Sequence, residues 1–334
     1  MLNLFDKVTE CRTKFYKNKR VLVAGGTGTI GVQLTRKLIK LGADVTVVSL
    51  DVPSRSKKLF GDYVEYIQAD LTDKVNCLKV TAGQEIVFNL LCNKGAASIS
   101  RKRAAECFIP MILYQLYLME AAYKNNVERF LFVSSIGAYP NIAIRKEEDL
   151  WEGFPKQIDC YAGIAKRIGE LQGEVYSLIY DWGAVRIVRP ANVYGAYDNF
   201  DSKTGQVIPA LITRMVSGEN PVRIWGFSAV RDFIYSEDVA DGMLLALEKL
   251  PPCEPVNLGS GIGYTVYRVA NIISSYMEPV PEIIQQKDVD IGDSVRVLDT
   301  VKAKSLLGFE MQTPIEVGIK QTIDWYRNFL KGVD

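Results

Sequence analysis

Residues 20–31 read RVLVAGGTGTIG, and this stretch decides the fold. Its first five residues form an apolar run typical of a buried strand, and the glycines that follow are spaced GxxGxxG. Gly25 suits a turn with positive φ, Gly28 lets the backbone approach a pyrophosphate, and Gly31 lets a helix pack closely on the strand. Free N–H groups at a helix start bind phosphate oxygens. The stretch therefore predicts a strand, a phosphate-binding turn and a helix over 29–41.

An acidic residue stands where a second strand, 44–50, is expected to end. Asp51 lies 20 residues after Gly31. A carboxylate there can accept both ribose hydroxyls of adenosine and repels a 2′-phosphate, so the pattern favours NAD over NADP. Asp51 could instead be a solvated loop residue, and nearby Arg55 weakens the preference for NAD. Asp70, at the end of a third strand, could accept from the adenine amino group or cap the next helix.

Apolar runs alternate with helical patterns over the first 190 residues. We expect strands at 20–24, 44–50, 63–68, 85–91, 129–134 and 184–188, with helices at 29–41, 108–124 and 159–180. Strands rich in Val, Ile, Leu and Phe are buried on both faces, and strand–helix repetition predicts an α/β class with a doubly wound parallel (Rossmann) sheet. We expect an N-terminal extension at 1–18, a cofactor-binding domain at 19–190 and a smaller lobe at 191–334. That lobe is expected to be mainly substrate-binding, with segments that return to the main domain.

The composition excludes several classes of function. The 334 residues include 40 Lys plus Arg and 39 Asp plus Glu, so the balanced charge gives no general attraction to nucleic acid. No histidine is present, which excludes His triads and His metal sites, and none of the six cysteines forms a CxxC pair. The most apolar stretch, 108–123, is short for a membrane span. With no apolar signal segment at the N-terminus, we expect a cytoplasmic protein that binds no metal, nucleic acid or membrane.

Seven stretches in a fixed order carry a family resemblance. They are GGTGTIG at 25–31, ADLTD at 69–73, SSIGAYP at 134–140, YAGIAK at 161–166, RPANVYG at 189–195, RDFIYSEDVA at 231–240 and DSVRVLDTVKAKSLLGF at 293–309. With them the chain resembles the extended short-chain dehydrogenases/reductases that act on nucleotide sugars. The likeness covers about residues 19–310. It looks most like the GDP-fucose synthase branch and also resembles sugar 4-epimerases.

The resemblance implies a mechanism in which a Tyr beside a Lys moves the proton of a sugar hydroxyl. A nicotinamide exchanges hydride with the carbon that bears this hydroxyl. The residues that match the catalytic positions are Ser135, Tyr161 and Lys166. Those that match cofactor positions, besides the glycines and acids above, are Thr29, Ile30, Leu71, Leu90, Lys166 and Val193. Those that match contacts to a nucleoside diphosphate sugar are Ser135, Asn192, Val207, Arg231 and Arg296.

One motif departs from the family pattern. The family places its Tyr four residues before the Lys, where this chain has Ala162, and Tyr161 stands five residues before Lys166. At about 100° per residue, position minus five points about 140° away from the lysine, whereas minus four lies about 40° away. Three accounts remain open: a one-residue bulge that returns Tyr161 to the lysine, another phenol such as Tyr139 or Tyr194, or a changed chemistry.

Other positions narrow the reaction that the resemblance implies. Sugar dehydratases have an Asp-Glu pair where this chain has Ile136 and Gly137, so elimination is not expected. GDP-fucose synthases have Cys at the position of Gly137 and His at that of Gln206, so their double epimerisation is not expected either. The sequence predicts a NAD-dependent epimerase or oxidoreductase of a GDP- or UDP-sugar, with C4 favoured. The alternatives are an NAD(P)H-dependent 4-keto-sugar-nucleotide reductase and a non-catalytic nucleotide-binding or assembly protein.

The helix expected over 108–124 is apolar nearly all round. Such a helix needs covering on two sides. Family members pair two such helices with two from a second copy. The resemblance therefore implies a homodimer that forms through helices 108–124 and 159–180.

Overall fold

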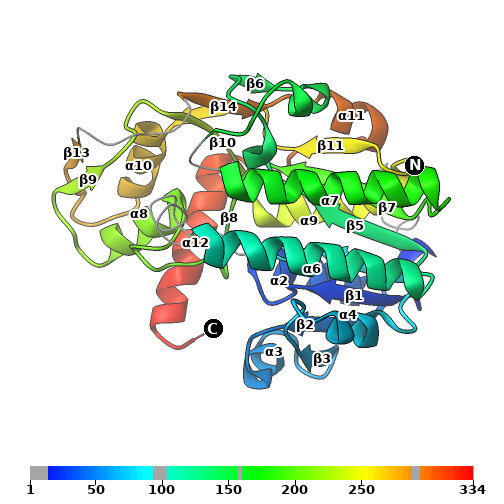
Figure 1. The fold of residues 1–334 in the computed structure, drawn as a ribbon. Coiled ribbons are helices and arrows are strands. Elements are labelled where there is room, and N and C mark those ends of the chain that lie inside the picture. The colour runs from blue at the N-terminus through cyan, green and yellow to red at the C-terminus, as the bar shows by residue number, and fades with distance from the viewer. Residues whose placement is uncertain (1–13, 93–103, 157–159, 287–293, 334) are drawn as a thin grey trace, which may run out of the picture.

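The main layer of the protein is a sheet of seven parallel strands (Figure 1). The computed structural model describes residues 14–92, 104–156, 160–286 and 294–333. In spatial order the strands are β11 (Pro255–Leu258), β7 (Val185–Pro190), β5 (Arg129–Val133), β4 (Ile86–Asn89), β1 (Arg20–Ala24), β2 (Asp44–Ser49) and β3 (Glu65–Gln68). The strand order reverses at β1, as it does in doubly wound folds. The predicted α/β class is confirmed.

Helices cover both faces of this sheet. On one face α2 (Thr29–Lys40) packs against α9 (Ser236–Lys249), and on the other α4 (Lys74–Thr81), α6 (Ala104–Lys124) and α7 (Cys160–Ile179) lie side by side (Figure 1). The central strands are mostly apolar because neither face meets solvent, and every residue of β4 is buried.

A second, mixed sheet of five strands forms most of the smaller lobe. Its strands are β6 (Ile144–Arg145), β8 (Asn192–Tyr194), β10 (Val230–Tyr235), β12 (Gly263–Thr265) and β14 (Val295–Leu298). A two-stranded pair, β9 (Val222–Ile224) and β13 (Ile283–Gln285), lies apart from it. The remaining elements are α3 (Pro53–Phe60), α8 (Val207–Val216), α10 (Val266–Ser274), α11 (Val301–Leu307), α12 (Ile315–Leu330) and the 3-10 turns η1 (Ile136–Ala138) and η2 (Glu147–Trp151).

The chain crosses from the first sheet to the second at one residue. Ala191 alone separates β7 from β8, so the carboxyl edge of the parallel sheet faces the second sheet. Later in the chain, α9 and β11 return to the main sheet, where β11 pairs with β7. Ligands of doubly wound proteins bind at the carboxyl edge of the strands. The carboxyl edge of the parallel sheet is therefore the expected place for a ligand.

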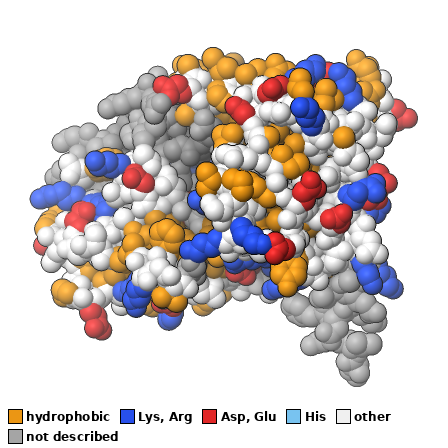
Figure 2. Space-filling view, turned by 90° about the horizontal axis from the view of Figure 1, so that it is seen from below, with side chains coloured by type: hydrophobic (Ala, Val, Ile, Leu, Met, Phe, Trp, Pro, Cys, Tyr) orange, Lys and Arg blue, Asp and Glu red, His pale blue; other side chains and the backbone are white. Residues whose placement is uncertain are grey.

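None of the described helices combines the length and the hydrophobicity that crossing a bilayer requires. The same residues contain no group of three or more Cys, Asp or Glu side chains arranged to hold a metal ion. On the face seen in Figure 2, basic and acidic side chains are interspersed.

Candidate active site

The turn after β1 is shaped to receive a phosphate. Gly25 has φ +81°, and a Cβ at Gly31 would lie 2.3 Å from the Gly25 carbonyl oxygen, so both positions require glycine. Gly28 is exposed, and a Cβ there would meet only the Gly25 oxygen, at 3.5 Å. No side chain caps the start of α2. The turn thus leaves the first N–H groups of α2 without a capping side chain and open to approach. This arrangement fits a bound pyrophosphate.

Asp51 stands directly beside this turn. Its carboxylate accepts a hydrogen bond from Thr27 Oγ1 at 2.6 Å and lies 3.2 Å from Nε of Arg55. Both contacts fix the acid at the end of β2, where an adenosine ribose would reach it. Arg55 also donates to the Thr27 carbonyl oxygen at 3.3 Å, so this arginine belongs to the same corner.

The other predicted cofactor residues lie along the same edge of the sheet. Asp70 is exposed, and its Oδ1 accepts from the N–H and the hydroxyl of Thr72, while Asp73 caps α4. Asp70 therefore caps a turn, not the helix. Leu71 is buried in the core, and Leu90 approaches the Gly25 turn from the end of β4. Two more, Thr29 and Ile30, form the first turn of α2, and Val193 lies in β8.

Lys166 is buried in α7 and faces the sheet. Its Nζ donates to the carbonyl oxygen of Leu91, just past β4, at 3.2 Å and lies 5.4 Å from the centre of the Phe132 ring. Ser135 follows β5 and is half-buried, and its Oγ accepts from the Gly137 N–H at 3.0 Å. Both residues thus lie at the carboxyl edge, as the phosphate-binding turn does.

Small residues bring α7 close to the elements beneath it. A Cβ at Gly163 would lie 2.5 Å from the Gly137 carbonyl oxygen, and one at Gly169 would lie 2.2 Å from Cζ of Phe132. Side chains at these positions cannot be accommodated without moving the helix. The glycines therefore fix the depth at which Lys166 enters the site.

Tyr161 is not brought to Lys166 in this structure. The helix is regular from Cys160 onward, without a bulge, and the Tyr161 side chain is 56% exposed. Its ring packs edge-on against Phe108 of α6, with 5.8 Å between the centroids. Ala162 is the residue on the side of Lys166, as the helical angle requires.

The other two candidate phenols are buried, and their hydroxyls already form hydrogen bonds within the protein. The hydroxyl of Tyr139 donates to Asn257 Oδ1 at 2.7 Å and accepts from Arg189 at 2.8 Å, and burial raises its pKa. Tyr194 donates to the Ile315 carbonyl oxygen at 3.5 Å, and burial raises its pKa as well. Of the three phenols, only Tyr161 has an exposed side chain.

A buried ion pair positions α7, and the sequence analysis missed its basic partner. Glu170, one turn after Lys166, binds Arg189 of β7 through two hydrogen bonds of 2.7 and 3.0 Å. Arg189 also donates to the Glu147 carbonyl oxygen at 2.7 Å. This network ties α7, the helix that carries Lys166, to the central sheet. The sequence carried a signal for this ion pair: a Glu four residues after Lys166 and an Arg directly before Pro190.

The two predicted phosphate-binding arginines are neighbours. Arg231 in β10 is in register with Arg296 in β14, so the two side chains leave the same face of the second sheet. Asn192 Nδ2 donates to the Asp232 carbonyl oxygen at 2.7 Å, and Val207 begins α8. The structure brings the arginines together and leaves Val207 36% exposed at a helix start.

Asp232 is a positioning residue that the sequence analysis did not assign. Its fully buried carboxylate accepts from the N–H and hydroxyl of Ser260, at 2.9 and 2.6 Å, and from the Gly261 N–H at 3.2 Å. Leu298 of β14 donates to it at 3.3 Å. The acid therefore binds the backbone that holds Arg231 and Arg296 side by side. An acid directly after the arginine in RDFIY was the available signal.

Comparison with known proteins identifies the family. A model described as the NAD dependent epimerase/dehydratase family matches residues 21–259. The chain belongs to this family. It is 25% identical over 319 residues to GDP-L-fucose synthase 1 of Arabidopsis thaliana, across 93% of this chain and 94% of that protein. It is 26% identical over 324 residues to a dTDP-4-dehydro-6-deoxy-D-allose reductase of a Streptomyces species, across 93% of this chain and 97% of that protein.

A solved structure of the same fold agrees with the family assignment. The crystal structure of UDP-glucose 4-epimerase with UDP-glucose from Thermotoga maritima superposes with a TM-score of 0.84 at 29% identity, over 93% of this chain and 99% of that one. Family membership makes the chain a relative of NAD-dependent nucleotide-sugar enzymes. The relatives bear the names of a synthase, a reductase and an epimerase, so family membership does not define the reaction.

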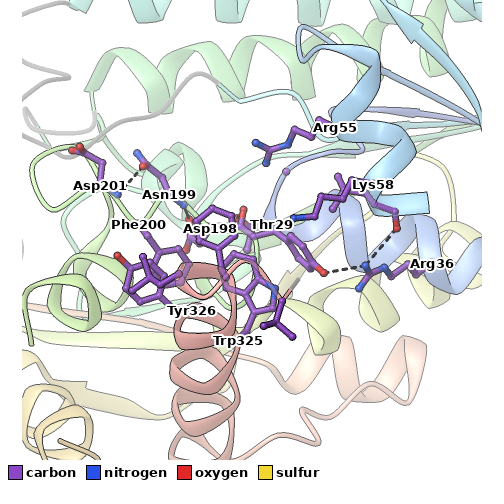
Figure 3. A pocket seen from close by; sticks show the side chains of 16 residues that line it. Thr29, Arg36, Arg55, Lys58, Asp198, Asn199, Phe200, Asp201, Trp325 and Tyr326 are labelled. Carbon is purple, nitrogen blue, oxygen red and sulfur yellow. Dashed lines mark hydrogen bonds between the residues drawn. The ribbon is translucent and has the colours of Figure 1, made fainter. Parts of the chain in front are cut away.

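A separate cavity of about 850 Å³ adjoins the phosphate-binding turn of this family member. It lies between α2, α3, the segment 197–201 and α12 (Figure 3). Arg36, Arg55 and Lys58 line one side, and Trp325 and Tyr326 of α12 face them from below. None of the residues predicted to contact the sugar nucleotide lines it.

Asp198, in the wall of this cavity, should make stability depend on pH. Burial raises its pKa to about 6, so the folded state binds a proton more tightly than the unfolded state does. The contribution of this carboxyl to stability is therefore favourable at low pH and is lost as pH rises through about 6. Asp198→Asn should raise Tm at pH 7.5 and have a smaller effect at pH 4.5, in thermal unfolding followed by circular dichroism.

Asp201→Asn is the matched control, because hydrogen bonds from Thr204 lower the pKa of Asp201. That variant should lower Tm at pH 7.5. An increase in Tm for Asp198→Asn that is the same at both pH values would contradict the assignment.

Proposed function

We propose that the chain is an enzyme that moves hydride between bound NAD and a carbon, C4 favoured, of a nucleoside diphosphate sugar. One observation carries the proposal: the buried Lys166 reaches the Leu91 carbonyl oxygen at the sheet edge that also holds the phosphate-binding turn and Asp51. NAD, when bound, supplies the hydride-accepting nicotinamide. The residues of the chain supply position, charge and proton transfer.

Ser135, Tyr161 and Lys166 have separate roles in this proposal. The hydroxyl of Ser135 donates a hydrogen bond to the reacting sugar oxygen and orients it. The ammonium of Lys166 lowers the pKa of a phenol beside it, because an opposite charge favours the phenolate. Tyr161 takes the proton of the sugar hydroxyl as general base and returns it as general acid.

For Tyr161 to act, its side chain must move to the position of Ala162. This requires a one-residue shift in the first turn of α7, before Gly163. Gly163 lies close to Gly137 and Pro155, so that a Cβ there would come within 2.5 Å of the Gly137 carbonyl oxygen. We propose that the shift is confined to residues 160–162 and accompanies substrate binding.

The substrate class follows from the arginine pair. Arg231 and Arg296 present two guanidinium groups from adjacent strands, which suits the two phosphates of a nucleoside diphosphate. Asn192 lies beside them at the start of β8, and we assign the contact to the base to Val207, the first residue of α8. The Thermotoga maritima relative holds UDP-glucose, which supports a UDP-sugar, and a GDP-sugar remains within the proposal.

Cofactor balance distinguishes an epimerase from a reductase. The purified chain should be incubated with UDP-glucose, UDP-galactose or GDP-mannose, and the products separated by chromatography. Interconversion of C4 epimers without net change in absorbance at 340 nm supports an epimerase. Stoichiometric loss of NADH or NADPH with a 4-keto-sugar nucleotide supports the reductase alternative. If the chain binds the sugar nucleotide but shows neither activity with any of these substrates, both the epimerase and the reductase proposals are contradicted.

One observation favours a non-catalytic alternative. The Tyr161 ring faces Phe108, away from Lys166, and both other phenols are buried. A protein of this fold that only binds nucleotides would need no phenol there. Binding without turnover is the result that this alternative requires.

Asp51 should determine the choice of cofactor. Hydrogen bonds to a charged group contribute about 1.5–3 kcal/mol, so Asp51→Asn is expected to weaken NAD binding by about tenfold or more. NADP binding should weaken less, because the repelling charge is lost with the acid. Isothermal titration calorimetry with both dinucleotides measures the ratio. Asp44→Asn, which changes an exposed acid at the other end of β2, is the control. An unchanged NAD to NADP ratio in Asp51→Asn would contradict the role.

The helix pair on one face of the sheet supports a homodimer. α6 and α7 pack side by side there (Figure 1), and both carry exposed apolar side chains, among them Ile109, Leu171, Val175 and Leu178. We propose that two copies bury these side chains against each other and that the enzyme works in the cytoplasm.

A further inference from the structure

The cavity beside α2 has the properties of a separate ligand site. At about 850 Å³ it lies within the usual range of roughly 300–1,000 Å³ for small-molecule pockets. It shares only the turn at Gly28 and Thr29 and the nearby Arg55 with the proposed cofactor site. Trp325 and Phe329, which line it from α12, have no place in the proposed reaction.

One wall of the cavity is a continuous aromatic surface. Trp325 stacks on Phe329 with 5.3 Å between centroids and an interplanar angle of 18°. Phe200 stacks on Tyr326 at 4.4 Å, and Tyr197 packs against Trp325 at 4.8 Å. Phe329 is 50% exposed, so the surface is open to a ligand at its outer end. Such a surface binds flat rings by stacking.

The opposite wall is basic (Figure 3). Arg36 donates through Nη2 to the Tyr197 hydroxyl at 2.9 Å and to the Leu59 carbonyl oxygen at 3.4 Å, and Arg55 pairs with Asp51. Lys58 lines the same wall and forms no hydrogen bond or ion pair with any other described residue. A phosphate is the anion that such a group of cations suits.

Two polar atoms in the cavity wall lack partners. Among the described residues, the buried Trp325 Nε1 and Asp198 Oδ2 accept and donate no hydrogen bond. Trp325 Nε1 is a donor, and Asp198 Oδ2 needs a donor unless it is protonated. Both atoms are covered, so a ligand that carries an acceptor and hydroxyl or amino donors supplies both partners only if its binding turns these side chains toward the cavity.

We propose that this cavity is a second nucleotide site, which binds a nucleoside phosphate while the cofactor occupies its own site. The base stacks on Trp325 and Phe329, the phosphate lies against Lys58 and Arg36, and a ribose hydroxyl or base amino group donates to Asp198. The inference goes beyond the proposed reaction and does not depend on it. A nucleoside phosphate is the class that combines a flat ring, an anion and donors in one molecule of this size.

The test is calorimetric titration of the full chain with AMP, GMP and UMP in the presence of saturating NAD. A background of Arg231→Ala with Arg296→Ala removes the arginine pair of the sugar site, so that a monophosphate bound there does not confuse the result. We expect at least one nucleotide to bind with one site per chain in this background. Trp325→Leu and Lys58→Ala should each weaken that binding at least tenfold and leave NAD affinity unchanged.

Trp225→Leu is the matched control, because Trp225 is 60% exposed and lies outside the cavity. It should leave nucleotide binding unchanged. Lys58→Ala replaces an exposed side chain, so it remains informative if Trp325→Leu fails to fold. The proposal is overturned if saturating NAD abolishes nucleotide binding, if binding disappears with the arginine pair, or if it survives both Lys58→Ala and Trp325→Leu. Loss of NAD binding or of sugar turnover would instead bear on the proposed reaction.

Discussion

Lys166→Met is expected to lower kcat by about 10²- to 10⁴-fold, the range that positioned acid–base groups contribute. The methionine keeps most of the length of the side chain and removes the ammonium that donates to the Leu91 carbonyl oxygen. Without this charge the pKa of a neighbouring phenol stays near its usual value of about 10, and little phenolate forms at neutral pH. Steady-state turnover of the sugar nucleotide measures kcat, and far-ultraviolet circular dichroism with thermal melting checks the fold.

Lys249→Met is the matched control, since Lys249 also donates to a backbone carbonyl oxygen, that of Leu307 at 2.8 Å, at the end of α9. It should change stability slightly and kcat little. A pH–rate profile adds a second readout, because the acidic limb, where the rate rises as the phenol ionises, should shift to higher pH in Lys166→Met. Equal turnover in Lys166→Met and the parent chain would remove Lys166 from the mechanism.

Moving the phenol by one residue is expected to give the second large effect. Tyr161→Phe should lower kcat by about 10²-fold or more, because the hydroxyl that transfers the proton is lost. Adding Ala162→Tyr to this variant should restore most of the turnover. Position 162 lies about 40° from Lys166 on the helix, so a phenol there reaches the lysine without any shift of the first turn. The single and double variants are compared in the same turnover assay.

Tyr267→Phe is the control for the loss of a phenol. Tyr267, in α10, is 40% exposed, and its ring packs on that of Phe227, much as the ring of Tyr161 packs on that of Phe108. If Tyr161→Phe retains full activity, Tyr161 is a packing residue and another group moves the proton. If Ala162→Tyr in the Tyr161→Phe background creates activity where the parent chain has none, the natural chain is a binding protein.

The strands of the main sheet could be predicted from the sequence because they are buried on both faces. The run at 20–24 became β1 with the predicted bounds, and the run at 184–188 extends to Pro190 as β7. Strands of the second sheet, such as β8, were missed because they are short, and only Tyr194 of the three residues of β8 is buried. Their pairing depends on contacts across the chain that no local pattern encodes.

The residues of the candidate site also fall into a group that could be predicted and a group that could not. Gly25 and Gly31 were predictable because the backbone geometry of the turn demands glycine at a fixed spacing. Asp51 lies beside this turn as expected, and its contact to a ribose stays a prediction. Arg189 and Asp232 stand in motifs that could have drawn attention to them, but their roles were not predicted because their partners come from distant parts of the chain. The catalytic role of Tyr161 and the domain boundary at residue 190 stay predictions.

The return of α9 and β11 to the main sheet limits how the chain can be divided. A fragment that stops at residue 190 would leave β7 as an unpaired edge and remove the helix against which α2 packs. It would also lose the acceptor of the Tyr16 hydroxyl, the Leu244 carbonyl oxygen. Unpaired strand edges and uncovered apolar helix faces promote aggregation. The nucleotide-binding half is therefore not a module that gene fusion or recombination can transplant without the later segments of its own chain.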